Sequence, residues 1–153
     1  MLIIRPPRED DSAQWFPLWR AYCSFYETDV PEAVSQTTWA RILDPGTPDL
    51  GAFVICAGEN GPLKGFATWV RHFATWSKAK RWYLEDLYVA PECRGQGAGR
   101  ALIEAVLDAA KADGSERLYW MTKADNTQAR LLYDKLAVES GFVRYDVDIM
   151  PEL

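Results

Sequence analysis

The sequence predicts an α/β domain in which helices flank a central mixed, mostly antiparallel sheet. The first observation is a set of three strand-like runs at 50–58, 63–76 and 81–89, joined by short connections. The second is an amphipathic helical stretch that follows the third run and leads to another apolar run at 117–122. Because a helical crossover joins parallel strands, we expect this run to lie parallel to 81–89.

Composition and charge narrow the class of protein. The 153 residues fit one domain, 1–153, and 48% hydrophobic with 25% charged residues is ordinary for a globular chain. The net charge of −5 and the lack of a basic run predict no nucleic-acid partner, because phosphate binding needs clustered Lys and Arg. No signal-peptide pattern and no apolar run of about 18 residues occur, so we expect a cytoplasmic protein without a membrane partner.

The first third of the chain is predicted to hold one short strand and two helices. Residues 2–5 form an apolar run that ends at two prolines. Residues 34–43 read as a helix stopped by "DPGTPD". Between them Pro17 predicts a late start or a kink in a helix whose aromatic and apolar residues recur at helical spacing: Trp15, Leu18, Trp19, Tyr22, Phe25 and Tyr26.

The remaining elements follow from turn and period signals. "ENGP" at 59–62 has hairpin chemistry. Residues 126–140 read as a helix with Gly141 as its C′ residue, and 142–149 alternate as a final strand. The helix after 81–89 has an apolar face made of Ala98, Ala101, Leu102, Ala105, Val106 and Ala109.

Cysteine and histidine usage argues against a metal site. Cys23, Cys56 and Cys93 are widely spaced and His72 is the single histidine, so a zinc site would lack ligands. We expect free, reduced thiols and no metal. A lone histidine is more often a satisfied surface or core residue than a base, so His72 is left out of the catalytic set.

A glycine-rich stretch separates the third strand-like run from its helix. Gly95, Gly97 and Gly99 follow Arg94, but a dinucleotide loop would need glycine where Arg100 stands, and no Walker GK-Ser/Thr follows. Two interpretations fit. Backbone N–H groups at a helix start could hold a phosphate beside Arg94, or glycine could only serve the dihedrals of a tight turn.

With these residues in place, the chain resembles the GNAT N-acetyltransferases. Arg94, Gly97 and Gly99 match the acetyl-CoA signature Arg/Gln-x-x-Gly-x-Gly/Ala. "IRPPREDD", "WYLEDLYV" and "NTQARLLYDKLAVESGF" are similar to the first strand and loop, the central strand and the Asn-x-x-Ala-x-x-x-Tyr helix of that family. "LEDLYV" and "LYDKLA..SGF" are most similar to polyamine, thialysine and yeast histone or polyamine acetyltransferases.

The resemblance implies the GNAT fold, with a splayed pair of parallel strands, and it implies acetyl-CoA as the acetyl donor. The pantetheine arm would lie between 84–89 and 117–122 like an added strand, against the backbone of Leu87, Tyr88 and Val89. The pyrophosphate would lie beside Arg94, on Gly95, Gln96, Gly97, Ala98, Gly99 and Arg100. The other flank of the cofactor would be Asn126, Thr127, Ala129, Tyr133 and Lys135.

Direct attack of an amine on a thioester in a ternary complex needs a base, an oxyanion donor and an acid. By resemblance Glu85 is the base, acting directly or through water. On a regular strand Glu85 and Asp86 face opposite sides, so one could face the site while the other pairs with a cation. Tyr133 is the candidate acid by its motif spacing, and a core tyrosine on a helical stripe is the alternative.

The acceptor side is expected around the first interhelical loop. "Tyr26-Glu27" resembles the amine-binding pair of the polyamine enzymes, Trp76 could wall the slot, and Glu85 could anchor the amine. An acidic, aromatic pocket suits a polyamine, a lysine-like amino acid or a basic peptide, although a solvated acidic loop also fits.

Two other functions stay open beside the amine acetyltransferase. One is a non-catalytic acyl-CoA-binding or sensing module, and the other is a histone-like protein lysine acetyltransferase, which no basic extension supports. The seven tryptophans fit an aromatic core plus a subunit interface, and members of the resembled family are commonly dimers, so we expect a homodimer.

Overall fold

The computed structural model describes residues 1–150, which divide into two compact units that meet between Trp120 and Met121 in sequence. The second unit contains one helix, α4 (Thr127–Leu136), among its described residues. The first unit contains, in chain order, β1 (Leu2–Arg5), α1 (Ser12–Phe25), α2 (Glu32–Leu43), β2 (Leu50–Ala57), β3 (Leu63–His72), β4 (Arg81–Val89), α3 (Ala98–Ala112) and β5 (Leu118–Tyr119), with 3-10 turns at Glu9–Asp11 and Pro91–Cys93.

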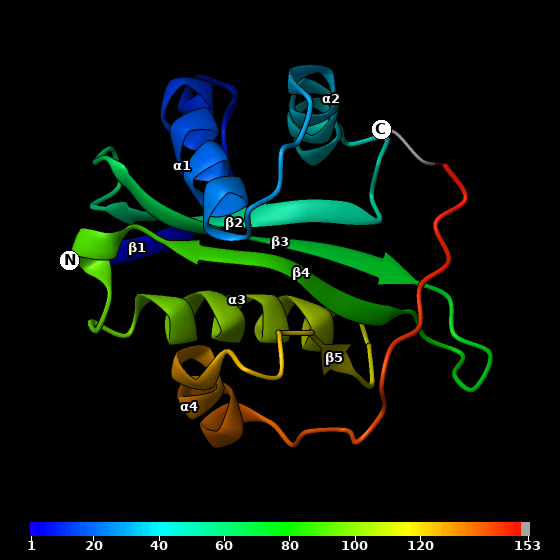
Figure 1. Cartoon of the computed structure of the whole chain (residues 1–153). Helices are drawn as coiled ribbons and strands as arrows, with labels where there is room; N and C mark the ends of the chain where they lie inside the picture. The colour runs from blue at the N-terminus through cyan, green and yellow to red at the C-terminus, as the bar shows by residue number, and fades with distance from the viewer. Residues whose placement is uncertain (151–153) are drawn as a thin grey trace. The chain divides into compact units, whose positions relative to one another are not determined.

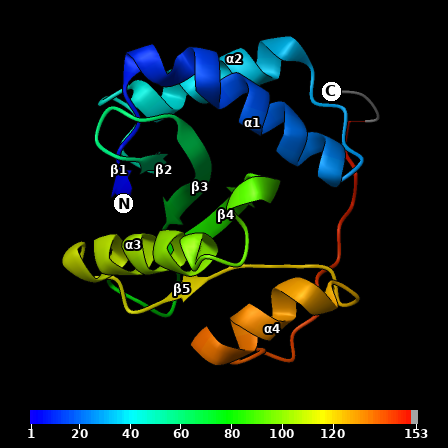
Figure 2. The same ribbon diagram turned by 90° about the vertical axis from the view of Figure 1, so that its left-hand side faces the viewer.

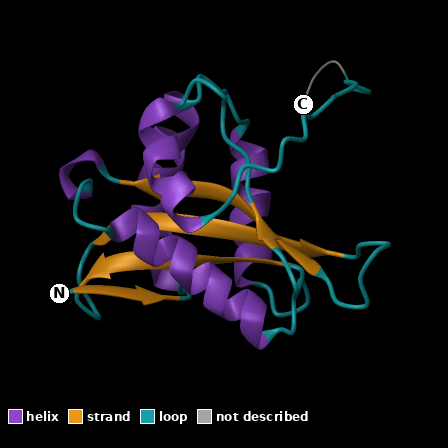
Figure 3. Cartoon of the chain, turned by 90° about the horizontal axis from the view of Figure 1, so that it is seen from below, coloured by secondary structure: helices purple, strands orange, loops and turns teal. Residues whose placement is uncertain are grey.

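The five strands form one sheet in the order β1-β2-β3-β4-β5. The first four run antiparallel to their neighbours and β5 runs parallel to β4, as the helical crossover predicts. In the first unit, α1 and α2 cover one face of the sheet and α3 the other (Figures 1 and 2). Viewed from below, α3 lies across the strands of its face (Figure 3). The mixed, mostly antiparallel α/β fold predicted from the sequence is confirmed.

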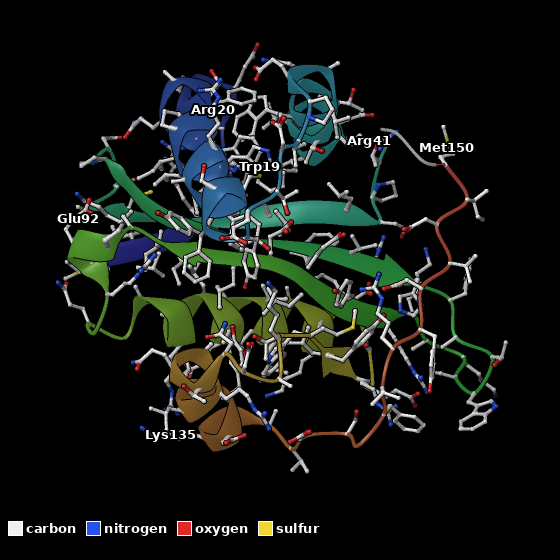
Figure 4. The ribbon with its side chains drawn as sticks, in the orientation of Figure 1. Trp19, Arg20, Arg41, Glu92, Lys135 and Met150 are labelled. Atoms are coloured by element: carbon white, nitrogen blue, oxygen red, sulfur yellow. The ribbon has the colours of Figure 1, made fainter. Side chains whose placement is uncertain are left out.

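An aromatic core joins α1 and α2 to the sheet. Trp15, Trp19 and Cys23 recur every four residues along α1, so they share one helical face, and all three are buried. Trp15 is fully buried and stacks on Trp19 with ring centroids 5.1 Å apart. Trp19 lies between α1 and α2 (Figure 4), and its indole N–H donates to Ser35 Oγ at 2.9 Å. Replacing Trp15 with Ala would cost about 3–5 kcal/mol of folding free energy.

The α3 face of the sheet is fixed by a second aromatic pair. The rings of Trp69 on β3 and Trp82 on β4 lie 4.2 Å apart, and Trp82 Nε1 donates to Asp113 Oδ2 at the end of α3 at 2.9 Å. Arg71 also pairs with Asp113 at 2.8 Å. These contacts show that Trp69, Arg71 and Trp82 point toward α3, which sets the facing of the neighbouring residues up to Leu84 on β4.

Three elements after α3 differ from the sequence prediction; before α3, the strand predicted at 63–76 ends at His72, and α1 begins at Ser12, ahead of Pro17. The strand predicted at 117–122 is only Leu118–Tyr119, because its ladder with β4 holds only two residue pairs. The helix predicted to reach residue 140 ends at Leu136, since Ala137 adopts an extended backbone, and Gly141 is therefore not its C′ residue. No strand forms over 142–149, because alternation alone does not make a ladder and no strand lies in the described part of the second unit.

Two further observations concern the cysteines and the apolar character of the helices. Cys23, Cys56 and Cys93 are buried and free. Over residues 1–150, none of the helices combines the length and the apolar character that crossing a membrane requires.

Candidate active site

The edge of β4 that faces β5 is open along most of its length. The two strands pair only at Trp82↔Leu118 and Tyr83↔Tyr119. From Leu84 to Val89, no strand of the described chain pairs with this edge. The opposite edge of β4 pairs with β3 along its whole length, except at one irregularity. Such an edge can bind an extended ligand through main-chain hydrogen bonds.

Leu87 and Val89 turn their backbone groups toward this open edge. Ala90 N–H donates to Lys64 O on the β3 side at 2.8 Å. Backbone groups alternate between the two edges of a strand in an antiparallel ladder, so the N–H and C=O of Val89 point away from β3. Val89 O accepts from Arg94 Nε at 3.0 Å, which agrees with that direction. By the same alternation Leu87 presents its N–H and C=O there, while Tyr88 bonds toward β3 and buries its ring in the core.

The glycine loop leads directly from this edge into α3. Gly95 and Gly97 have φ of +76° and +80°, so the left-handed backbone itself requires glycine at both positions. Gly97 is the N-cap of α3, and its C=O accepts the N–H of Ala101 at 3.0 Å. The preceding N–H groups of the first turn, on Ala98, Gly99 and Arg100, have no partner within the helix. No acidic side chain lies in this turn, so an anion meets a favourable helix end.

Two arginines border the loop, and both have intramolecular partners. The Arg94 guanidinium lies 5.6 Å from the ring centre of Tyr88 and 6.0 Å from that of Phe25. Arg100 pairs with Glu104 at 2.8 Å on the same helix. The two arginine side chains are exposed, so these contacts contribute little to stability and can be exchanged for a ligand phosphate.

A bulge interrupts β4 at Glu85. Thr68 is opposite Asp86 while Trp69 is opposite Leu84, so Glu85 has no counterpart on β3. Thr68 Oγ1 donates to Asp86 Oδ2 at 2.5 Å, on the face covered by α1, whereas Leu84 shares the α3 face with Trp69. The strict alternation assumed for this strand is therefore wrong here, because the extra residue reverses the facing of everything that follows.

The bulge directs Asp86 into a cavity of about 270 Å³ between α1, the α1–α2 connection and β4. The Tyr22 hydroxyl donates to the Asp86 carboxylate. The cavity is lined by Trp19, Tyr22, Cys23, Tyr26, Thr28, Val30 and Asp86. Aromatic walls with a carboxylate at one side suit a cationic group. Among the predicted substrate residues, Tyr26 lines this cavity.

Two other predicted substrate residues, Glu27 and Trp76, lie outside this cavity. Glu27 does not line the cavity and has φ of +54° at the end of α1. Trp76 is 89% exposed in the β3–β4 connection. The sequence analysis missed Asp86, Tyr22 and Thr68 as site residues. The spacing of Tyr22 and Tyr26, one helical turn apart, was the available signal for the aromatic wall.

The two neighbouring carboxylates have perturbed protonation. Desolvation raises the pKa of Glu85, and the charge of Asp86 raises it further. Burial raises the pKa of Asp86 against the opposing effect of hydrogen bonds from Thr68 and Tyr22. A carboxylate with a raised pKa is a stronger base, which suits removal of a proton from an amine.

The second unit carries the remaining predicted cofactor residues on and before α4. Asn126 is its N-cap, and Asn126 Oδ1 accepts the Ala129 N–H at 3.4 Å while its amide donates to Thr122 Oγ1 at 3.2 Å. Thr127 is the first helical residue and Lys135 lies in the last turn (Figure 4). Tyr133 is on α4, and its backbone C=O accepts the Ala137 N–H at 2.9 Å. No group of three potential metal ligands occurs within the described part of either unit.

The fold and site define an acyl-transfer class of protein, with an open strand edge, an anion-binding helix start and a carboxylate pair. The Acetyltransferase (GNAT) family profile matches residues 13–137. The chain therefore belongs to the GNAT acetyltransferase family and is an N-acetyltransferase.

Known proteins of three kinds are similar to the chain. It is 35% identical over 144 residues to the D-amino-acid N-acetyltransferase HPA3 of Saccharomyces cerevisiae, covering 94% of this chain and 89% of that protein. It is 36% identical over 80 residues to the thialysine N-epsilon-acetyltransferase of Bos taurus, covering 52% and 46%. The solved structure of AAC(6')-Iy in complex with the bisubstrate analogue CoA-S-monomethyl-acetylneamine matches with a TM-score of 0.83 at 20% identity, covering 98% and 99%.

Proposed function

We propose that the protein transfers the acetyl group of acetyl-CoA to a primary amine on a small cationic acceptor, by direct attack in a ternary complex. The observation that carries the proposal is the carboxylate pair at the β4 bulge, where Asp86 enters an aromatic cavity beside an open strand edge. The acceptor classes are polyamines and amino acids with a free amine. The names of the yeast and bovine relatives support the second class.

The residues of the first unit fit coenzyme A. Leu87 and Val89 offer backbone groups to a pantetheine arm, and the loop from Gly95 to Arg100 offers N–H groups to a pyrophosphate beside Arg94. Gly95 and Gly97 carry no Cβ atom and the space beside each is open, so the backbone there can approach a ligand closely. When bound, acetyl-CoA supplies the thioester carbonyl that the amine attacks.

Glu85 takes the amine proton in this proposal, directly or through water. An amine with an ordinary pKa near 10.4 pays about 4.6 kcal/mol to be neutral at pH 7, so a base beside it lowers a substantial barrier. Asp86 holds the cationic part of the acceptor in the aromatic cavity. A backbone N–H on the open edge of β4, at Leu87 or Val89, stabilises the developing oxyanion.

The second unit carries the other residues that the motif resemblance assigns to the cofactor and the leaving group. The motif resemblance assigns Asn126, Thr127, Ala129 and Lys135 to the cofactor and Tyr133 to the departing thiolate. A phenol near pKa 10 protonates a thiolate near 8.5 uphill by about 2 kcal/mol, so orientation of the sulfur is a large part of this role.

The cavity favours a small acceptor over a protein tail. Its volume of about 270 Å³ suits one amine-bearing side chain or a polyamine segment. The acceptor test is thiol release from acetyl-CoA with a panel of polyamines, D- and L-amino acids, lysine analogues and histone-like peptides. We expect turnover with a small amine. Turnover with peptides alone would support the protein acetyltransferase, and coenzyme A binding without any turnover would support the sensing module.

Four further expectations belong to the proposal. We propose that residues 1–153 act as a single acetyltransferase domain, which the family match over 13–137 supports. We propose a cytoplasmic location, which the three free thiols support. We propose a homodimer, to be tested by light scattering coupled to gel filtration. We propose that the acetyl transfer needs no metal. EDTA in the assay should therefore leave the rate unchanged.

A further inference from the structure

His72 and Tyr119 form a hydrogen-bonded pair that the proposed mechanism does not use. His72 is the last residue of β3 and Tyr119 the last residue of β5, 47 positions away. Their Nε2 and hydroxyl oxygen lie 2.7 Å apart, and the ring planes meet at 81°. Two strand ends that are not neighbours in the sheet are thus joined across β4.

The environment of the histidine fixes the direction of this hydrogen bond. His72 Nδ1 lies 2.7 Å from Phe73 O, and a carbonyl only accepts, so Nδ1 carries the proton of the neutral ring. Nε2 then has a lone pair and accepts the Tyr119 O–H. The hydroxyl proton is held by His72, and the remaining lone pairs of the Tyr119 oxygen are directed away from the histidine.

Tyr119 stands at the fork between β4 and β5. Tyr83↔Tyr119 is the last pair of the ladder, and the two rings stack with centroids 4.8 Å apart. Tyr83 alternates with Trp82 and Leu84, so it faces away from α3, toward the side that Asp86 faces after the bulge. Glu85 is two residues further along β4, and its charge acts on the Tyr119 phenol. The open edge of β4 begins directly after the Tyr83↔Tyr119 pair.

We infer that the Tyr119 oxygen, oriented by His72, accepts a hydrogen bond from the acceptor amine beside Glu85. Tyr119 is then an acceptor-binding residue and His72 a positioning residue that acts through it. The inference rests on the proposed function, because it needs an amine at the β4 bulge. An ammonium presents three N–H donors, and Glu85 and Tyr119 together offer it two acceptors from two strands.

The pair makes acceptor binding depend on the histidine ring, because the lone pair on His72 Nε2 keeps the Tyr119 proton away from the amine. The charged groups around the pair are Arg81, opposite His72 on β4 and paired with Glu116 at 3.8 Å, and Glu85.

The test compares Tyr119→Phe and His72→Gln with the wild type, using the best acceptor from the amine panel. We expect Tyr119→Phe to lower kcat/KM for the acceptor about tenfold or more, mainly through KM, with unchanged coenzyme A affinity. His72→Gln should raise the acceptor KM by a smaller factor, because the Tyr119 hydroxyl then stays in place but loses its fixed orientation. The double variant should behave like Tyr119→Phe alone, and Tyr145→Phe serves as the control.

Several results would overturn the inference. They are a wild-type acceptor KM in Tyr119→Phe, multiplicative effects in the double variant, or a loss of acceptor affinity that only follows a loss of thermal stability. An independent readout is nitrogen-15 NMR of the single histidine in the wild-type protein, where we expect the Nδ1–H tautomer and an Nε2–H tautomer contradicts the pair. A wild type that acetylates no amine refutes the proposed function instead, whatever the tautomer.

Discussion

Leu84 and Asp86 are two residues apart on β4 and yet face opposite sides of the sheet. The bulge at Glu85 causes this reversal, and it places the adjacent acidic residues Glu85 and Asp86 at the same site. Leu84 stays in the apolar layer under α3, while Asp86 reaches Thr68, Tyr22 and the aromatic cavity. A regular strand would have buried one carboxylate against α3.

Glu85→Gln should lower kcat by about 10²–10⁴-fold at pH 7, because the amide cannot take the amine proton. Its raised pKa means that the wild type loses activity as the pH falls through the folded-state value, and the variant should lack that acid limb. Steady-state rates from pH 5.5 to 9 measure both effects. Glu59→Gln, in the β2–β3 turn, is the matched control, and a full-rate Glu85→Gln enzyme refutes the base assignment.

Asp86→Asn should raise the acceptor KM about tenfold or more, because a charged hydrogen-bond partner is lost. Burial raises the pKa of Asp86 in the folded state, so the wild type loses stability as the pH rises above the unfolded value near 3.9. The variant should therefore melt no lower than the wild type at pH 7.5. Its acid limb should also move to lower pH, since Asp86 no longer raises the pKa of Glu85.

Asp108→Asn, an exposed residue on α3, controls for the change of net charge. A strong drop in the melting temperature of Asp86→Asn at pH 7.5, with an unchanged acceptor KM, would mean that Asp86 is structural.

Gly97→Ala should weaken coenzyme A binding and cost about 1–2 kcal/mol of folding free energy, because an alanine is strained at φ of +80°. Gly58→Ala is a matched control, with φ of +88° in the β2–β3 connection, and in both cases the added Cβ meets open space. Calorimetric titration with coenzyme A should separate them. Equal affinities in the two variants would leave the loop as a turn only.

Tyr133→Phe should slow turnover with little loss of coenzyme A affinity, because the ring is kept and only the hydroxyl is removed. Rapid-mixing measurement of thiol release gives the chemical step directly. Unchanged turnover would remove Tyr133 from the mechanism and leave it as a packing residue of α4.

Asp11→Asn should destabilise the fold by about 3 kcal/mol, because it breaks a buried ion pair. Asp11 is 4% exposed and binds Arg5 through both oxygens at 2.7 and 2.9 Å, besides accepting the Arg8 N–H at 2.7 Å. Arg5 lowers the pKa of Asp11, so this stabilisation is present above the unfolded value near 3.9 and is lost as the pH falls below it. Urea unfolding at pH 7 and pH 3, with the exposed Asp10→Asn as control, measures it.

Much of the fold could be predicted from local patterns. Helical spacing marked the faces of α1 and α3, and turn residues separated β2, β3 and β4, because these signals depend on neighbours within one turn or one hairpin. The exceptions were weaker elements. Residues 142–149 alternate like a strand without forming one, and β5 is shorter than its apolar run, since a strand exists only where a partner backbone is available.

The sequence by itself determined the family, the glycine loop and the identity of Glu85 as a candidate base, because these are written in short contiguous motifs. Only the tertiary structure decided that Asp86 enters the aromatic cavity, that Tyr22 and Thr68 hold it, and that His72 meets Tyr119. Those relationships depend on one unpaired residue in the register of β3 with β4 and on contacts between distant strands, which no local period encodes.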